Sequence, residues 1–457
     1  MKSLRRSLSM SAATLVVLAM PARAELILDW NTAATNAIQS SGEDTAQASR
    51  DLALLSTAVY DAVNGIDGGY TAYFVQGSGP AGASMEAAAA SAANTVLQAL
   101  YPALGSSFTT LYSDELNNIA NSQAKTDGVN WGNQVASAIL TARAGDGASN
   151  AGTTPYNPSG QIGRWAPTPV HNGPGYQFPP TQPGWGNVTP FGIQQGNQFR
   201  PATSLDLTSQ SYADAFNEVQ SLGSSTSGTR TTAQTTAAYA WADGQGTFTA
   251  AGHWNQIANT MIHNASLDLR TQARILATLN LAVADATISA FDASYANDNW
   301  RPVTGIAYGG DNIQDIDGNP NTTGDPFWDP LVDTPPMPSF VNVNTAIAQA
   351  AAKVLKLYFG SHNVVMEEDT DGDGVYDTVK TYATIDDALN DAANAAVWGG
   401  TDWRYATDGG LQVGDGVAIY DINNYFLPVA QVPEPSSLLM LVAAGFMLRC
   451  RRRGRRD

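Results

Sequence analysis

Apolar residues recur every three or four positions along most of the chain, which is the spacing of helices that bury one face. The longest such segment, residues 267–293, is apolar over much of its girth, so we expect a central, buried helix there. No internal repeat and no strand-rich region interrupts the pattern, and β structure is expected only as short pairs within loops. The pattern predicts an all-α fold, with helices at 46–64, 84–102, 106–122, 127–145, 207–222, 230–243, 250–264, 267–293, 345–358, 384–396 and 408–421.

Two long tracts, 146–203 and 296–342, break the helical spacing with many Gly, Pro and Asn residues. The first tract is too rich in aromatic residues for a flexible linker, because so many rings need a cover in water. We therefore expect an ordered wrap over the surface, which acts either as a lid or as a binding surface. The rings concerned are those of Trp165, Tyr176, Phe178, Trp185, Phe191 and Phe199.

Residues 1–24 have the order of a secretory signal peptide. A basic head is followed by the apolar run 10–20 and by the small-residue cleavage pattern at Ala22–Ala24. An N-terminal core helix is the alternative. The pair Arg5–Arg6 leaves the export route open between the general and the twin-arginine pathways.

The other end of the chain has the features of a second targeting signal. Val432-Pro433-Glu434-Pro435 precedes an apolar run at 436–448 and an arginine cluster at 449–456. The apolar run would rise only about 20 Å as a helix, short of the ~30 Å hydrocarbon core of a bilayer. The order, over 433–457, resembles the PEP-CTERM sorting signal of Gram-negative bacteria. The alternative is a plain tail anchor.

That resemblance implies a sequence of events after export. The protein would be retained transiently at the inner membrane and cleaved near the motif by an exosortase-type processing enzyme. It would then be released to the cell surface or the extracellular matrix, where a matrix component is a candidate partner.

The part between the two signals is strongly acidic, because residues 25–432 hold 13 Lys and Arg against 39 Asp and Glu. Such a surface repels nucleic acid and anionic lipid, so no nucleic-acid partner is expected. The only cysteine, Cys450, lies in the C-terminal signal. Stability therefore has to come from a packed core, in one large domain or in two fused bundles, and not from disulfides.

Residues 369–377, DTDGDGVYD, have the oxygen-ligand spacing of a calcium loop. A glycine at 374 allows the sharp turn, and closely spaced carboxylates repel one another unless a cation lies between them. The ligands expected are Asp369, Asp371, Asp373, the carbonyl of Val375, and Asp377. Lys380 stands where a calcium loop has its final Glu, so Glu367, Glu368, Asp386 or Asp387 would have to complete the shell. We predict a structural calcium site; a solvated Asp/Gly turn is the alternative.

Several stretches resemble the bacterial vanadium-dependent haloperoxidases, relatives of the type 2 phosphatidic acid phosphatases. The resemblance runs over about 25–421 and rests on the stretches 48–66, 198–243, 280–306, 325–340 and 398–418. It implies an α-helical fold of two fused four-helix bundles. It also implies a pocket in which a Lys, two Arg, backbone and Ser donors and two His hold vanadate or phosphate, since a multiply charged anion needs matching cations and donors.

Carried over position by position, the pattern of that pocket falls on residues of other kinds. The Lys position is Ser294, the first Arg is retained as Arg301, and the second Arg is Ala396. The segment that carries Ser, Gly and His in the family falls on Asn342, Val343 and Asn344, after Val341. The His that bonds to vanadium falls on Asp402.

One charged member of the pocket thus remains, and Asp402 places a carboxylate where the anion would lie. A like charge at about 4 Å costs on the order of 4 kcal/mol near a surface. We therefore predict a vestigial pocket that does not hold vanadate, with Arg301 as an ion-pair partner of Asp402. His171, His253 and His263 are interpreted as packing or surface histidines.

Three functions follow as hypotheses. The first is an exported, non-catalytic homologue of the haloperoxidases that binds calcium. The second is an active vanadium-dependent haloperoxidase or acid phosphatase. The third is a different enzyme in the same cavity that uses Asp402, Asp408 and Arg301, because a buried carboxylate can perform acid–base chemistry.

Overall fold

The computed structural model describes residues 25–169, 175–202, 205–308 and 316–429, so both predicted end signals and His171 lie outside the described residues. Within these ranges the chain is mostly helical, which confirms the predicted fold class. The one sheet of the described part is an antiparallel pair, β1 (Val364–Glu368) and β2 (Thr378–Tyr382), on either side of the acidic loop.

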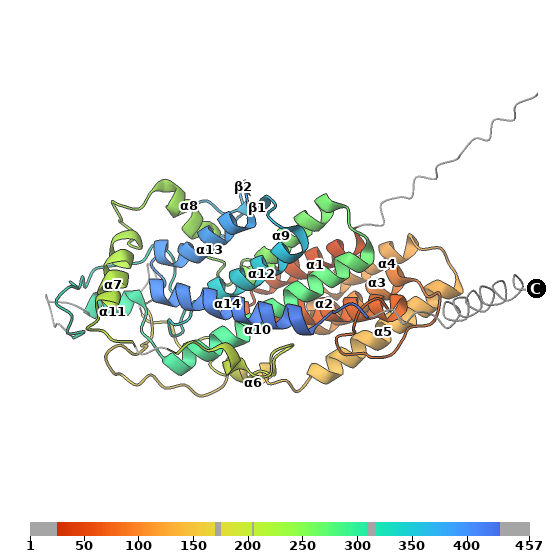
Figure 1. Ribbon diagram of the computed structural model, residues 1–457, viewed down its shortest axis with the longest axis horizontal. Coiled ribbons are helices and arrows are strands. Elements are labelled where there is room, and N and C mark those ends of the chain that lie inside the picture. The colour runs from red at the N-terminus through yellow and green to blue at the C-terminus, as the bar shows by residue number, and fades with distance from the viewer. Residues whose placement is uncertain (1–24, 170–174, 203–204, 309–315, 430–457) are drawn as a thin grey trace, which may run out of the picture.

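The helices form two groups joined by a shared centre (Figure 1). The first group consists of α1 (Leu26–Ser41), α2 (Thr45–Asp67), α3 (Met85–Leu100), α4 (Gly105–Asn117), α5 (Gln123–Arg143) and the short α6 (Ala148–Ala151). The second consists of α7 (Gln210–Leu222), α8 (Thr232–Ala240), α11 (Pro302–Tyr308), α12 (Val343–Phe359), α13 (Ile385–Trp398) and α14 (Arg404–Asn424). Two helices, α9 (Thr249–Ala265) and α10 (Leu269–Asn297), contact both groups.

Helix α10 is the central helix that the sequence predicts. Asp268 caps its first turn by accepting a hydrogen bond from the Thr271 N–H at 2.8 Å, and it ends at Asp298 in the left-handed conformation. It is the one described helix long and apolar enough to cross a membrane, but 94% of its apolar stretch is buried inside the protein. Burial on every side by other helices makes it a core helix.

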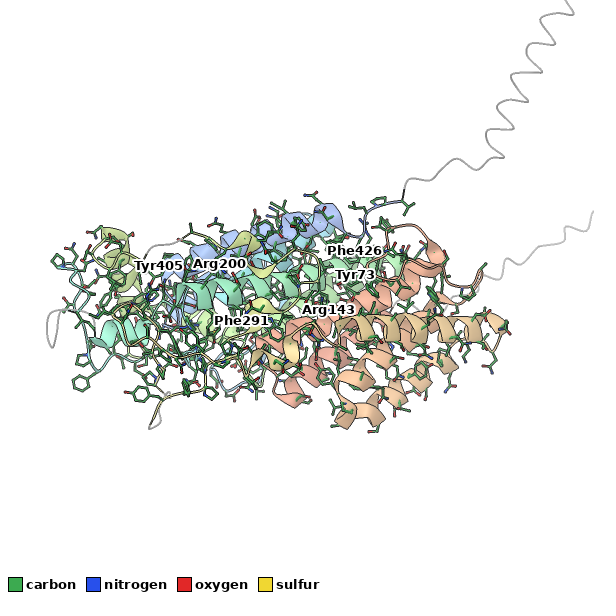
Figure 2. All side chains as sticks on the ribbon, turned by 90° about the horizontal axis from the view of Figure 1, so that it is seen from below. Tyr73, Arg143, Arg200, Phe291, Tyr405 and Phe426 are labelled. Carbon is green, nitrogen blue, oxygen red and sulfur yellow. The ribbon has the colours of Figure 1, made fainter. Side chains whose placement is uncertain are left out.

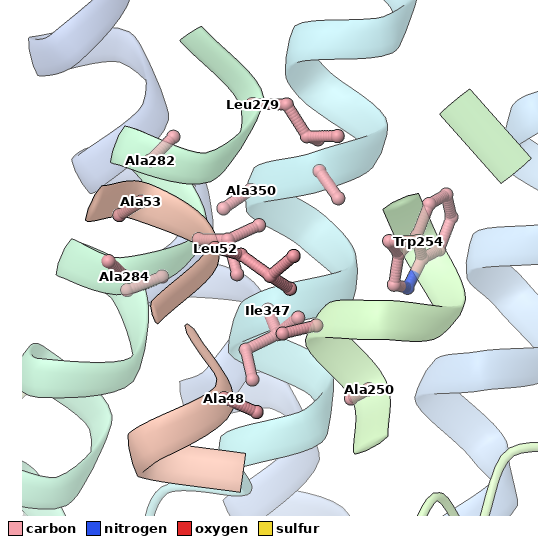
Figure 3. Close-up of a cluster of buried hydrophobic side chains, with 14 of the residues drawn as sticks. Ala48, Leu52, Ala53, Ala250, Trp254, Leu279, Ala282, Ala284, Ile347 and Ala350 are labelled. Carbon is pink, nitrogen blue, oxygen red and sulfur yellow. The ribbon is translucent and has the colours of Figure 1, made fainter. Parts of the chain in front are cut away.

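Small residues bring these helices close together. In Figure 3 the alanines of α10 lie beside Leu52 and Ala53 of α2 and beside Ile347 and Ala350 of α12. Between α12 and α14, a methyl group on Gly414 would come within 2.3 Å of the Ala346 carbonyl oxygen. The backbones therefore approach one another more closely than any larger side chain would allow.

The first irregular tract is ordered over its described residues, as predicted, and runs along the helices (Figure 1). Trp165 and Trp185 are fully buried, and Phe191 packs under the guanidinium of Arg143, whose central carbon lies 3.9 Å from the ring centre. The expectation that all of these rings are covered is wrong for Tyr176 and Phe178, which are 64% and 58% exposed. Both are close in sequence to residues 170–174, and it is those five residues that are outside the described part.

Two side chains fasten this tract to the core. Arg143 of α5, labelled in Figure 2, donates to the carbonyls of Thr189 and Pro190 at 2.6 and 2.9 Å. Asp285 of α10 accepts hydrogen bonds from the backbone N–H groups of Phe191, Gly192 and Ile193 at 2.6 to 2.8 Å. One carboxylate therefore satisfies three buried donors.

A second buried carboxyl group, Asp421 of α14, lies near Asp285. Neither of its oxygens has a hydrogen-bond partner among the described residues. Burial raises the pKa of Asp285 to about 6, against the effect of its three N–H donors. Burial and the neighbouring Asp285 raise the pKa of Asp421 well above its ordinary value, so Asp421 is the member of the pair that keeps its proton.

The last described residues return to the first group of helices. Phe426 is buried against Tyr60 of α2, with ring centres 4.5 Å apart. The backbone N–H of Val429 donates to the Gly69 carbonyl at 3.1 Å, and Thr71 donates to the Leu427 carbonyl at 2.8 Å. The segment that follows α14 is thus hydrogen-bonded to the loop that follows α2.

Candidate functional site

A cleft of about 460 Å³ lies where the start of α12 meets α8, α13 and the second irregular tract; we call it the 301–402 cleft. Its walls include six of the seven positions to which the sequence assigned the vestigial pocket: Arg301, Asn342, Val343, Asn344, Ala396 and Asp402. The seventh, Ser294 of α10, is fully buried and donates to the Val341 carbonyl at 3.0 Å, directly beneath the start of α12. Residues up to 108 positions apart in sequence therefore meet at one place.

The ion pair expected between Arg301 and Asp402 is present. Arg301 Nη1 lies 2.7 Å from Asp402 Oδ2, and the two residues are only 3% and 1% exposed. The other bonds of the guanidinium go to backbone carbonyls: Nε to Met337 at 2.7 Å, Nη1 to Thr401 at 3.1 Å and Nη2 to Pro338 at 3.2 Å. All three nitrogens of the only retained cation are used within the protein.

Asp402 is correspondingly saturated with donors. Besides Arg301, the Nδ2 of Asn342 donates to its Oδ2 at 2.8 Å, and the hydroxyl of Ser339 donates to its Oδ1. A buried carboxylate is tolerated when a cation and several donors surround it, as they do here. Sequence reasoning missed Ser339, because no spacing relates it to a residue 63 positions away.

Asn342 has a second role at the start of α12. Its Oδ1 accepts a hydrogen bond from the Thr345 N–H at 2.7 Å, so it is the N-cap of the helix. Free N–H groups at a helix start attract anions, and here the chain's own Asn342 side chain takes one of them, that of Thr345. Val343 and Asn344 add no charge, and Asn344 donates to the Ala242 carbonyl at 3.1 Å.

Ala396, in the place of the second Arg, contributes only its backbone. Its carbonyl oxygen accepts from the N–H groups of Thr401 and Asp402 at 2.9 and 3.2 Å, which fixes the turn that presents Asp402. Asp408 is absent from the lining of the cleft, although burial raises its pKa. The structure therefore does not bring Asp408 together with Asp402 and Arg301.

Sequence reasoning also missed three further carboxylates of the cleft, Asp44, Asp243 and Asp333. Asp44 caps α2 and also accepts from Gln182 at 2.7 Å. Asp243 Oδ1 lies 3.0 Å from Nδ1 of His253, which is fully buried and stacks on Trp241 with ring centres 4.7 Å apart. His253 is thus a packing histidine with one polar partner, as expected, and its Nε2 has no partner among the described residues.

The acidic loop gathers some of the predicted calcium ligands. Asp369, Asp371 and Asp373 each offer an oxygen within 4.8 Å of the others. Asp369 also accepts from the N–H groups of Gly372 and Gly374 at 2.8 and 2.9 Å, which folds the loop around it. Asp377 lies outside this group and accepts from the Thr370 hydroxyl at 2.8 Å.

Three of the four residues suggested for the rest of the shell, Glu368, Asp386 and Asp387, are engaged elsewhere. Asp386 pairs with Lys356 at 2.6 Å, and Asp387 forms the capping box of α13 with Thr384. Lys380 lies 3.5 Å from Glu368 and 3.0 Å from Asp391. The loop packs against the start of α9, since Tyr376 stacks on Phe248, the residue before that helix, with ring centres 4.7 Å apart.

Comparison with known proteins matches two parts of the chain to family models. Residues 274–426 match the family model of the VCPO second helical-bundle domain, and residues 431–456 match the PEP-CTERM protein-sorting motif. No curated protein matches the chain at a significant level.

Solved structures share the fold over most of the chain. The crystal structure of the first bacterial vanadium-dependent iodoperoxidase aligns with a TM-score of 0.74 and 22% identity, covering 89% of this chain and 98% of that one. A holo-type bacterial vanadium-dependent chloroperoxidase aligns with a TM-score of 0.64 and 17% identity, covering 83% and 92%. At these identities the likeness establishes the fold and not the activity. The chain therefore has the helical-bundle fold of the vanadium-dependent haloperoxidases, with a match to their second-bundle domain and a PEP-CTERM sorting motif after it.

Proposed function

We propose that this protein is an exported, non-catalytic homologue of the vanadium-dependent haloperoxidases, in which its own Asp402 carboxylate takes the place of the bound oxyanion. The observation that carries the proposal is the set of bonds around Asp402. Arg301, Asn342 and Ser339 all direct their donors at this one side chain. The donors that would hold a foreign anion already hold an internal one.

The charges around the cleft support the same conclusion. Holding vanadate or phosphate requires cations and donors that are free to meet it. Arg301 is neutralised by Asp402, and the positions Ser294, Asn344 and Ala396 supply no positive charge. A second anion about 4 Å from Asp402 would meet a repulsion of the order of 4 kcal/mol.

We predict that the purified protein has neither haloperoxidase nor phosphatase activity. Incubation with orthovanadate, bromide, peroxide and a halogenation indicator dye should give no colour, and a chromogenic phosphate ester should stay intact. A bacterial vanadium-dependent iodoperoxidase, assayed in parallel with iodide, serves as the positive control. Vanadate-dependent turnover would instead favour the second candidate function, an active enzyme, which the shared fold alone supports.

We further propose that the loop 369–377 binds calcium and is ordered by it. The three converging carboxylates support this, and sites of this kind in extracellular modules are filled at about 0.1–1 mM calcium. Calcium should raise the melting temperature by a few degrees and a chelator should reverse the rise, because a ligand that binds only the folded state stabilises it. The double variant Asp371→Asn/Asp373→Asn should lose the response, whereas Asp114→Asn on α4 should keep it. An unchanged melting temperature would leave a solvated turn as the better description.

The sorting motif supports recognition by an exosortase-type processing enzyme and export into the cell envelope of a Gram-negative bacterium. We propose transient retention at the inner membrane, followed by release to the surface or the matrix. Replacing Pro433, Glu434 and Pro435 by alanine should keep the protein in the membrane fraction. If the altered protein is released as fast as the parent, this route is wrong.

A further inference from the structure

The described chain ends beside the loop that follows α2, and the two segments form one face of the protein. We call residues 68–76 and 425–429 together the exit face. They are joined by backbone hydrogen bonds, such as the one that the Thr71 N–H donates to the Leu427 carbonyl at 2.8 Å. The exit face is therefore part of the folded domain, and it is also the place from which the chain continues to the C-terminal signal.

Three large apolar side chains of the exit face are open to solvent. Phe74, Val429 and Leu427 are 49%, 48% and 36% exposed. Phe74 directly follows Tyr73 in the chain. Leu427 directly follows Phe426, whose ring centre lies 6.3 Å from that of Tyr73 (Figure 2). The exposed side chains thus belong to one area, and apolar side chains that gather in this way mark an interaction site.

The exit face has no charged side chain, although the part of the chain between the two signals holds 13 Lys and Arg against 39 Asp and Glu. Neither 68–85 nor 422–433 contains Asp, Glu, Lys, Arg or His. At the border, Arg270 pairs with Asp67 at 2.7 Å, and Asp61 beneath the loop is only 1% exposed. An acidic protein is repelled by an anionic bilayer, so an uncharged face is a side from which it can approach lipid.

The chain beyond the exit face carries the apolar run 436–448. An extended chain spans at most about 3.6 Å per residue, so the run begins within about 25 Å of Val429. As a helix the run would rise about 20 Å, short of the ~30 Å hydrocarbon core. A short span is accommodated when the bilayer thins or when flanking residues reach toward it, and a weak anchor holds stably only with a second contact.

We infer that the exit face rests on the lipid bilayer while the apolar run 436–448 is inserted in it. Phe74, Leu427 and Val429 then enter the interfacial region of the lipid. Two contacts, the inserted run and the face, hold the domain in one orientation. The inference rests on the proposed retention at the inner membrane and adds which side of the domain meets the lipid.

Fluorescence quenching by lipid tests this on the full chain, reconstituted by detergent removal into vesicles of phosphatidylethanolamine and phosphatidylglycerol. With the native Cys450 replaced by serine, Phe74→Cys carries an environment-sensitive fluorophore. Phe327→Cys is the matched control, because Phe327 is 91% exposed in a loop beside α11, at the other end of the molecule from α3 and α5 (Figure 1). Doxyl-labelled phospholipid should quench the fluorophore at position 74 and leave the one at position 327 bright.

A second measurement uses flotation with the same vesicles. Phe74→Ser/Val429→Ser should lower the partitioning of the protein into vesicles about tenfold, because the apolar side chains supply part of the binding. Phe327→Ser/Val379→Ser removes the same residue types from sites that are 91% and 66% exposed, and it should bind as the parent does. Melting temperatures equal to that of the parent show that both variants fold.

The outcomes separate the inference from the proposed retention. A parent chain that does not float with vesicles would overturn both. A parent that floats, with equal quenching at positions 74 and 327, would overturn only the inference and leave the inserted run as the sole anchor. A fluorophore at position 74 that is shielded from aqueous iodide before vesicles are added, and that lipid does not quench, would also overturn it. In that case the C-terminal run or a second copy covers the exit face.

Discussion

Replacing Asp402 by alanine is expected to lower the free energy of unfolding by about 3–5 kcal/mol. The reason is that Arg301 would stay buried, 3% exposed, without the carboxylate that neutralises it. Ser339 and Asn342 would lose their acceptor as well. Urea unfolding of the parent and of Asp402→Ala, compared at equal slope, gives the difference directly.

Removing both charges should cost much less than removing one. The double variant Arg301→Met/Asp402→Leu leaves no unpaired charge, and replacing a buried ion pair by apolar residues of similar size is often neutral. Formate should also restore part of the stability of Asp402→Ala, because it is a small carboxylate that can enter the vacated place. An external ligand at 100 times its Kd adds about 2.7 kcal/mol. Equal effects of formate on the parent and on the variant would refute the idea that Asp402 stands in for a bound anion.

Replacing Asp285 by alanine is expected to be at least as damaging, with a loss of about 4 kcal/mol or more. The change leaves the N–H groups of Phe191, Gly192 and Ile193 buried without an acceptor, and each such group costs about 1–3 kcal/mol. It would also release the aromatic tract from α10. Besides unfolding curves, limited proteolysis within residues 175–202 should show the release as faster cleavage.

Asp421→Asn is the matched control, because Asp421 is equally buried but accepts no hydrogen bond from a described residue. The raised pKa of Asp421 means that the folded state holds a proton that the unfolded state loses above its ordinary value near 4. The stability of the parent therefore falls as pH rises, and the asparagine variant lacks this loss. Relative to the parent, Asp421→Asn should gain stability between pH 4 and pH 8. A loss comparable to that of Asp285→Ala at any pH in this range would contradict the difference in hydrogen bonding.

Helical spacing was sufficient to predict the long helices, because most residues of their buried faces are apolar. It did not predict α1, whose buried face includes Asn31 and Thr35, and Asn31 donates to Asn259 of α9 at 2.9 Å. It also missed α11, which lies within a tract that reads as irregular. In both cases tertiary contacts between polar or loop segments decide the structure, and a count of apolar positions does not record such contacts.

Spacing along the sequence also allowed part of the candidate site to be predicted. Positions 294, 301, 342–344, 396 and 402 could be located because each keeps a spacing to recognisable neighbours such as Trp300 and Trp403. The carboxylates Asp44, Asp243 and Asp333 have no such spacing, since three separate elements carry them to the cleft. The acidic lining of the cleft is therefore a property of the assembled fold and not of one motif.

The segment after α14 also limits how far the sorting motif can lie from the folded domain. Val429 is hydrogen-bonded to Gly69, and the sorting motif begins at residue 431. An extended chain spans at most about 3.6 Å per residue, so the distance from Val429 to the first residue of the motif is less than roughly 10 Å. A processing enzyme that recognises the motif would therefore act within a short distance of the folded domain. Lengthening or shortening this segment offers a way to set how closely the domain is held without altering the domain itself.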